Sequence, residues 1–345
     1  MFDQVLDSSR MWEYTAGLPE QVALAATNAT ATPGLPYKHE IENVVVLGMG
    51  GSGIAGDVLV AVAAPFMSVP VAVVKAYTIP AFVGPGSLVF AISFSGNTEE
   101  TIDASAEALR HGARVVFVTS GGELAQMARD SGEPLIRVPA DIPQPRAAIG
   151  AMSIPPLVVL EEIGLFPGAT HWIDLAVAQL QRRRDALVQP RSEIVSIAER
   201  IGDTIPLIHS SGAIGRATAQ RWKTQINENA KRPAFFSVYS ENCHNELAGW
   251  DYLNDLTRTR MVVVNLRHES EHPQVVRRFE IAYDLMGSKV KDVISVKGVG
   301  EGELSQLLDL VLTGDFVSLQ VAKNNGIDPG PIPVLNEMKN RLAGR

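Results

Sequence analysis

The stretch Ala91-Ile-Ser-Phe-Ser-Gly-Asn-Thr-Glu-Glu100 carries three hydroxyl side chains between two regular elements. The apolar run at 88–92 is typical of a buried strand, and residues 101–112 have the pattern of a helix. Gly96 lets the backbone turn among the hydroxyls of Ser93, Ser95 and Thr98. A strand that ends in such a turn and opens a helix points backbone N–H groups and the positive end of the helix dipole outward. The stretch therefore predicts an anion site, most often one for phosphate.

The same residues also allow a purely structural interpretation. Asn97 and Glu100 have the spacing of a capping box, in which two side chains satisfy free N–H groups at the start of a helix. That role alone would account for several of the polar residues. The local pattern leaves both interpretations open.

Buried strands alternate with helices through the first half of the chain. A predicted helix over 11–28, which Pro19 divides into two pieces, precedes a linker over 30–37 that is rich in proline and glycine. The half closes with a mostly apolar helix over 149–164. Such alternation indicates a parallel sheet with helices on both faces. The predicted strands are 43–47, 69–74, 88–92, 114–118 and 134–138.

The second half repeats this order of elements. Strands are predicted at 205–208, 261–266 and 293–296, with a helix at 273–286 between the last two. Arg267-His-Glu-Ser270 stands where the first half has its hydroxyl loop, so only the first half would keep a phosphate site. We expect an α/β protein of four parts: an N-terminal helix and linker (1–34), a first domain (35–165), a connecting helix (166–194) and a second domain (195–345).

A glycine-rich turn, Gly48-Met-Gly-Gly-Ser-Gly53, follows the first strand. It satisfies the G-x-G-x-x-G pattern of dinucleotide sites, which also calls for an acidic residue at the end of the next strand. That strand ends instead in Lys75-Ala-Tyr77, which argues against a nicotinamide or flavin cofactor. A close approach of the backbone to another ligand explains the glycines equally well, and Ser52 adds a hydroxyl. We expect Gly51 and Ser52 to bind the substrate, and we expect no cofactor.

Composition limits the classes of partner. The net charge of −8 argues against a nucleic-acid surface, which would need a basic footprint. Cys243 is the one cysteine, so no intrachain disulfide can form, and this fits a reducing compartment. No signal peptide is evident at residues 1–10, and no run reaches the roughly 18 apolar residues of a membrane helix. We expect a soluble cytoplasmic protein without a membrane partner.

Several polar groups outside the loop are candidates for chemistry. A predicted helix over 217–231 carries amides around one carboxylate, Glu228, for which a solvated helix end is the structural alternative. Lys323 ends a predicted amphipathic helix over 314–326, where a lysine normally complements the dipole. The basic run Arg182-Arg-Arg184 is interpreted as a solvated helix end.

A polar segment, Ser240-Glu-Asn-Cys-His-Asn-Glu-Leu247, lies between these helices. Glu241, His244 and Glu246 could ligate a metal, but their spacing matches no standard zinc pattern. A role for His244 in acid–base chemistry is the more plausible interpretation, and we expect no metal.

Taken together, these motifs resemble the bifunctional phosphoglucose/phosphomannose isomerases, a family of the sugar isomerase (SIS) fold. The resemblance runs in order over nearly the whole chain, and its last three motifs are the more specific. It implies two tandem SIS-type domains, each a doubly wound, flavodoxin-like parallel sheet with helices on both faces. The matching stretches are Gly48-Met-Gly-Gly-Ser-Gly53, Ser93-Phe-Ser-Gly-Asn-Thr-Glu-Glu-Thr101, Lys223-Thr-Gln-Ile-Asn-Glu-Asn-Ala-Lys231, Asn242-Cys-His-Asn-Glu246 and Lys323-Asn-Asn-Gly-Ile-Asp-Pro-Gly-Pro-Ile-Pro333.

The resemblance also implies roles for individual residues. Ser93, Ser95 and Thr98 would hold the sugar phosphate. Glu228 would move a proton between C1 and C2, and Arg146 would stabilise the charge of the enediolate. His244 would assist ring opening with Lys323 near the ring oxygen. The family forms homodimers in which the histidine comes from the partner subunit, so a shared active site is expected here.

The expected reaction interconverts glucose 6-phosphate and mannose 6-phosphate with fructose 6-phosphate. A carboxylate removes the proton at C2 of the open aldose, and the cis-enediol is planar there, so it no longer records which aldose entered. A carboxylate in reach of both carbons, with a cation for the developing charge, suffices without a metal. The alternative is an SIS-type regulator that binds sugar phosphate without turnover. We expect the site between the two halves of the chain.

Overall fold

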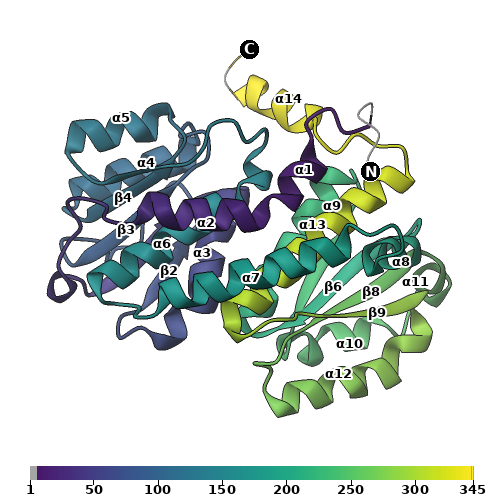
Figure 1. Cartoon of the computed structure of the whole chain (residues 1–345). Coiled ribbons are helices and arrows are strands. Elements are labelled where there is room, and N and C mark those ends of the chain that lie inside the picture. The colour runs from purple at the N-terminus through teal and green to yellow at the C-terminus, as the bar shows by residue number, and fades with distance from the viewer. Residues whose placement is uncertain (1–5, 343, 345) are drawn as a thin grey trace.

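In the computed structural model, which describes residues 6–342 and 344, the chain forms two parallel β-sheets flanked by helices (Figure 1). The five-stranded sheet has the order β2-β1-β3-β4-β5 and the four-stranded sheet the order β7-β6-β8-β9. The first four positions of the two sheets correspond, which confirms the repeat and the doubly wound fold. The exact bounds of the predicted domains stay a prediction. The strands are β1 (Asn43–Leu47), β2 (Val71–Val74), β3 (Ser87–Ile92), β4 (Arg114–Thr119), β5 (Leu135–Arg137), β6 (Ile205–Ser211), β7 (Phe235–Tyr239), β8 (Met261–Arg267) and β9 (Asp292–Lys297).

Helices cover both faces of the first sheet, and its central strands β1, β3 and β4 are buried on both sides. Val45 and Val89 face a cluster that includes Ala104 of α4 and Leu124 of α5, whereas Val46 faces the opposite cluster. The helices before and within this half are α1 (Met11–Ala16), α2 (Leu18–Ala29), α3 (Gly50–Val62), α4 (Glu99–Arg110), α5 (Gly122–Ser131) and α6 (Ile149–Ile163). The predicted break at Pro19 is confirmed, since α1 ends at Ala16 and α2 begins at Leu18.

The second half has the same layering with different covering elements. Leu207 and Val263 face Trp250 and Met286 on one side of the sheet, and Ile208 faces the main core on the other. Sequence reasoning had not predicted β7, α11 or α14. The helices from the connection onward are α7 (Ala169–Leu187), α8 (Glu193–Ile201), α9 (Gly212–Asn229), α10 (Glu246–Gly249), α11 (Asn254–Arg260), α12 (Pro273–Met286), α13 (Gly302–Asn324) and α14 (Pro333–Leu342).

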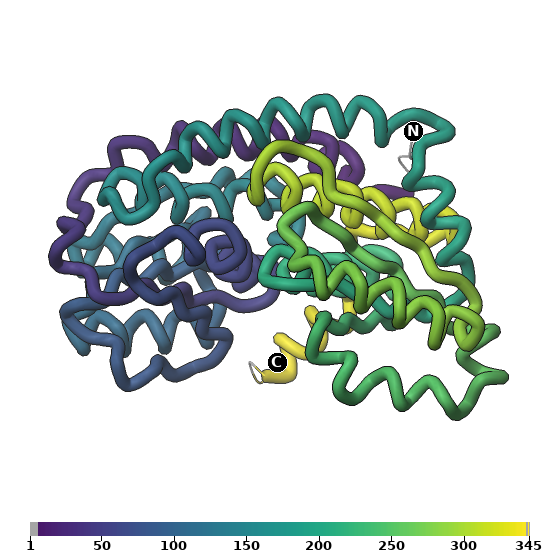
Figure 2. Tube along the Cα trace, turned by 90° about the horizontal axis from the view of Figure 1, so that it is seen from below, coloured from purple at the N-terminus to yellow at the C-terminus, as the bar shows by residue number. Residues whose placement is uncertain are grey.

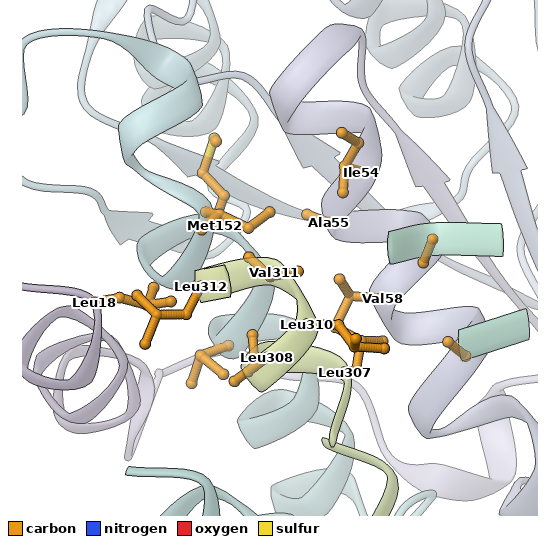
Figure 3. Packing of buried hydrophobic residues seen from close by; sticks show 14 of the residues in the cluster. Leu18, Ile54, Ala55, Val58, Met152, Leu307, Leu308, Leu310, Val311 and Leu312 are labelled. Carbon is orange, nitrogen blue, oxygen red and sulfur yellow. The ribbon is translucent and has the colours of Figure 1, made fainter. Parts of the chain in front are cut away.

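The helix α13 joins the two halves into one core. Figure 3 shows its side chain Leu312 beside Leu18 of α2 and Leu310 beside Val58 of α3, with Met152 of α6 also lining the cluster. Every residue from 304 to 322 is buried. The prediction of an amphipathic helix over 314–326 is therefore wrong in two respects: the helix begins at Gly302, and it is covered on all sides because both halves pack around it.

The long helix α7 lies across both halves, as the two views show (Figures 1 and 2). Two of the three arginines in its basic run contact other helices. Arg183 Nε lies 2.8 Å from Oδ1 of the buried Asp309, and Arg184 Nη1 lies 2.7 Å from Glu20 Oε1. These two join α7 to α13 and to α2, so the prediction of a solvated helix end is wrong for them, whereas Arg182 is exposed. No helix in the described part of the chain is long and apolar enough to cross a membrane.

The crossing of α9 and α13 depends on a glycine. Trp222 of α9 is fully buried, its indole Nε1 donates to Leu310 O at 2.8 Å, and a Cβ on Gly314 would lie 2.2 Å from that nitrogen. We expect Gly314→Ala to lower the free energy of unfolding by about 1–2 kcal/mol, because overpacking outweighs the better helix propensity of alanine. Denaturant unfolding measures this. Gly249→Ala is the control, since its Cβ would meet nothing within 4 Å, and an equal loss there would contradict the packing argument.

Candidate functional site

The hydroxyl loop between β3 and α4 is held in shape by its own side chains. Ser93 is buried, and its Oγ lies 2.8 Å from Thr98 Oγ1 and accepts from Gly96 N at 3.2 Å. Ser95 is exposed, and its Oγ accepts from Asn97 N at 3.2 Å. The loop follows the carboxyl end of a parallel strand, which is where open α/β sheets bind ligands.

The capping box considered for this loop is wrong. Thr98 is the N-cap residue of α4, and Asn97 uses its Oδ1 to accept from Glu123 N at 3.0 Å. Asn97 therefore fastens the loop to the start of α5. No side chain caps the first backbone N–H groups of α4, so they remain available to an anion.

The glycine turn supports the loop from behind. The Oγ of the buried Ser52 accepts from Phe94 N at 3.2 Å and donates to Met152 Sδ at 3.2 Å. Gly51 packs on the segment that carries Arg146, since a Cβ there would lie 3.5 Å from Pro145 O and 3.6 Å from Arg146 Cα. The turn thus connects the hydroxyl loop to Arg146. Direct binding of substrate by Gly51 and Ser52 stays a prediction.

Arg146 is a buried cation from the first half that is held mainly by the second. It lies in a short 3₁₀ helix, η3 (Pro145–Ala147), and its side chain is 3% exposed. Its Nε donates to Asn229 Oδ1 at 2.8 Å, and its Nη2 donates to Pro329 O at 2.6 Å and to Gly330 O at 2.7 Å. Burial lowers the pKa of the guanidinium below its ordinary value, and nearby Glu228 opposes that shift. The group remains a cation because arginine does not deprotonate in proteins.

Glu228 stands beside Arg146 near the end of α9. Its Oε2 lies 3.5 Å from Arg146 Nη1, and its side chain is 28% exposed, so one face of the carboxylate is open. The alternative of a solvated helix end is wrong, because Arg221, Gln225 and Asn229 of the same helix are buried. In such an arrangement the open face of the carboxylate can transfer a proton, and the buried cation beside it can stabilise an oxyanion.

Two residues of α13 that sequence reasoning missed, Asp315 and Ser318, fix this arrangement. Arg221 Nη2 donates to Arg146 O at 2.5 Å and pairs with the buried Asp315 at 2.7 Å. Asn229 Nδ2 donates to Ser318 Oγ at 2.9 Å. Asp315 and Ser318 lie on α13, a turn apart, and only the burial of that helix reveals their role.

The remaining predicted residues do not join this pair within one chain. His244 is exposed at the end of a 3₁₀ helix, η4 (Glu241–His244), and among the described residues it forms no hydrogen bond or ion pair with Arg146 or Glu228. Lys323 is half-buried in the last turn of α13, one to two turns beyond Ser318. The roles predicted for both stay predictions.

Glu246, one of the acidic side chains after β7, is used within the fold. Glu246 Oε1 lies 2.7 Å from Nε2 of the buried His209. Burial raises the pKa of Glu246, but hydrogen bonding and charge interaction with His209 leave it below its ordinary value overall. Within the described residues there is no group of three His, Cys, Asp or Glu side chains placed to hold a metal ion.

Comparison with known proteins covers both halves. Residues 39–136 match the SIS domain, and residues 191–342 match the bacterial phospho-glucose isomerase C-terminal SIS domain. A bifunctional phosphoglucose/phosphomannose isomerase of Caldicellulosiruptor bescii is 33% identical, over 96% of this chain and 99% of the relative. One from Aquifex aeolicus is 35% identical, over 89% of this chain and 91% of the relative.

Solved structures share the fold at much lower identity. The C-terminal domain of glucosamine-fructose-6-phosphate aminotransferase from Francisella tularensis superposes with a TM-score of 0.69. It covers 96% of this chain and 100% of its own, at 15% identity. At that identity the likeness bears on the tandem SIS architecture alone.

Proposed function

The chain belongs to the family of bifunctional phosphoglucose/phosphomannose isomerases, and on that premise we propose that it works through a cis-enediol intermediate. It is an isomerase that interconverts hexose 6-phosphates. The observation that carries the proposed mechanism is the pair of Arg146 and Glu228, which lie 3.5 Å apart and come from opposite halves.

In the proposed mechanism Glu228 transfers the proton and Arg146 holds the charge. The carboxylate takes the proton from C2 of the open aldose and returns it to C1, which gives fructose 6-phosphate from glucose 6-phosphate or mannose 6-phosphate. The guanidinium stays cationic throughout and stabilises the enediolate oxygen.

The phosphate would bind at the hydroxyl loop, away from the reacting carbons. Ser95 and Thr98 expose hydroxyls there, and the buried Ser93 keeps the loop in shape. The Gly51–Ser52 turn touches both this loop and the backbone of Arg146, so it sets the spacing between phosphate and enediolate. Binding energy at the phosphate is thereby used to orient the sugar.

We expect Ser95→Ala to raise KM for both aldose phosphates about tenfold, because one hydrogen bond to a charged group is lost, and to leave kcat nearly unchanged. Steady-state kinetics with a coupled dehydrogenase assay measure this. Ser131→Ala, an exposed serine on α5, is the matched control. A fall in kcat at constant KM would argue that the loop takes part in chemistry and not in binding.

Ring opening and the oligomeric state are further parts of the proposal. His244 would open the ring, with Lys323 near the ring oxygen. Since His244 is exposed and apart from Glu228, it would serve the site of a partner in a homodimer. Light scattering tests the dimer. Mixing His244→Ala with Glu228→Gln tests the shared site, because mixed dimers would regain one intact site.

A cytoplasmic location also belongs to the proposal, and the single cysteine, Cys243, is consistent with a reducing compartment. Cell fractionation tests it. The assay with the two aldose phosphates also tests the alternative of a regulator that binds without turnover, since such a protein would convert neither.

A further inference from the structure

Lys231 is a charged residue beside the catalytic pair for which the mechanism above has no role. It follows Ala230, the C-cap of α9, and its backbone is left-handed, with φ of 52°. Its Nζ donates to Glu228 O at 2.5 Å and to Pro329 O at 3.2 Å. The first bond is ordinary for a lysine at a helix end. The second is not, because Pro329 belongs to the tail beyond α13.

These contacts close a ring around the catalytic pair. Pro329 O accepts from both Lys231 Nζ and Arg146 Nη2, and Arg146 Nη1 in turn faces the carboxylate of Glu228. Lys231 thus connects the backbone of Glu228 to Pro329, and Pro329 in turn accepts from Arg146. Removing its side chain opens the ring at the point where α9 and the tail meet.

Two local costs set Lys231 apart from an ordinary helix-end lysine. A left-handed backbone is unfavourable for a residue with a Cβ, and helices commonly place glycine there. Burial and the nearby Arg146 lower the pKa of the ammonium to about 8, against the opposing effect of Asp328 and Glu228. Residues that violate local rules in this way are found chiefly at functional sites.

We propose that Lys231 is a positioning residue of the isomerase. Its ammonium clamps the end of α9 to the 328–330 tail and so holds Glu228 in place beside Arg146. The inference rests on the proposed roles of Glu228 and Arg146. It adds an ammonium group that acts through Glu228 and Arg146 and touches no substrate.

The clamp should respond to pH. Lys231 lines an open pocket of about 410 Å³ with Arg232, Leu256 and Ile327, so its proton exchanges with bulk water. The charged groups that act on it are Arg146, Glu228 and Asp328. Above pH of about 8 the ammonium becomes a neutral amine, whose hydrogen bonds to the two carbonyls are weaker. Wild-type kcat is therefore expected to decline as pH rises through 8.

The test compares Lys231→Gly with Lys231→Arg. Glycine suits the left-handed backbone but has no ammonium, so Tm should stay within about 2 °C of the wild type while kcat falls about tenfold. KM should be nearly unchanged, and the decline of kcat near pH 8 (the alkaline limb) should be absent. Arginine keeps its charge, so the alkaline limb of kcat should move above pH 9 or so. The matched control is Ala31→Gly, which relieves a left-handed backbone with φ of 58° and should leave kinetics unchanged.

The outcomes separate this inference from the mechanism on which it rests. Should Lys231→Gly keep wild-type kcat and pH profile while Glu228→Gln is inactive, the clamp alone would be refuted. Should Glu228→Gln be active, the base assignment fails first. Where Lys231→Gly does not fold, Lys231→Arg decides, and an alkaline limb that stays at the wild-type pH would overturn the proposal.

Discussion

Glu228→Gln is expected to lower kcat about 10³-fold for both glucose 6-phosphate and mannose 6-phosphate. A glutamine amide cannot accept the C2 proton, and positioned general bases contribute roughly 10²–10⁴ in rate. KM should change little, because the phosphate is bound at the loop of Ser95 and Thr98. The measurement is a coupled assay on both aldoses, together with exchange of the C2 proton with solvent, which should be lost to the same degree.

The matched control is Glu199→Gln, which removes an exposed carboxylate from α8. It should leave both activities unchanged. If Glu228→Gln lost activity on only one aldose, the hypothesis that one base serves both aldoses through a shared enediol would be wrong. Equal loss on both, with exchange abolished, is the pattern that one carboxylate requires.

Arg146→Lys should lower kcat about 100-fold and also destabilise the protein. Lysine keeps the charge but not the planar fork that contacts Asn229, Pro329 and Gly330 at once. A cation that moves off the enediolate oxygen forfeits stabilisation that typically amounts to 10²–10³ in kcat. The buried acceptors left without a donor should reduce the free energy of unfolding by about 2 kcal/mol. Steady-state kinetics and denaturant unfolding measure the two effects separately.

Arg137→Lys provides the control for this change, because Arg137 is exposed and its Nη1 donates to Ser120 O at 3.2 Å on the surface. We expect small effects there. Loss of stability in Arg146→Lys with unchanged kcat and KM would show that Arg146 is structural only. A raised KM with unchanged kcat would instead place it in ground-state binding.

Much of the fold follows from local pattern. The runs at 43–47 and 88–92 are apolar without alternation, which only a strand buried on both faces needs, and both are strands of the first sheet. The second-half repeat was visible for the same reason. The strand β7 was missed because its residues are mostly half-exposed at the edge of its sheet, so no continuous apolar run marks it.

The local pattern failed where two halves share an element. α13 carries polar residues such as Asp309 and Asp315, of which Asp315 lies in the stretch 314–326 that was predicted to be amphipathic. In the structure Asp309 pairs with Arg183, and Asp315 pairs with Arg221. Charged residues of this kind are buried only with partners, and those partners lie about 90 or more positions away in the chain.

The sequence by itself determined the hydroxyl loop, the glycine turn and the resemblance that pointed to Glu228 and Arg146, because each depends on residue types at short spacing. Only the tertiary structure decided that Arg146 meets Glu228 at 3.5 Å, that Ser52 ties the loop to the turn, and that Lys231 and the tail close the ring. The reason is physical. A hydrogen bond or ion pair between distant segments depends on how helices such as α9 and α13 pack, and no local spacing encodes that distance.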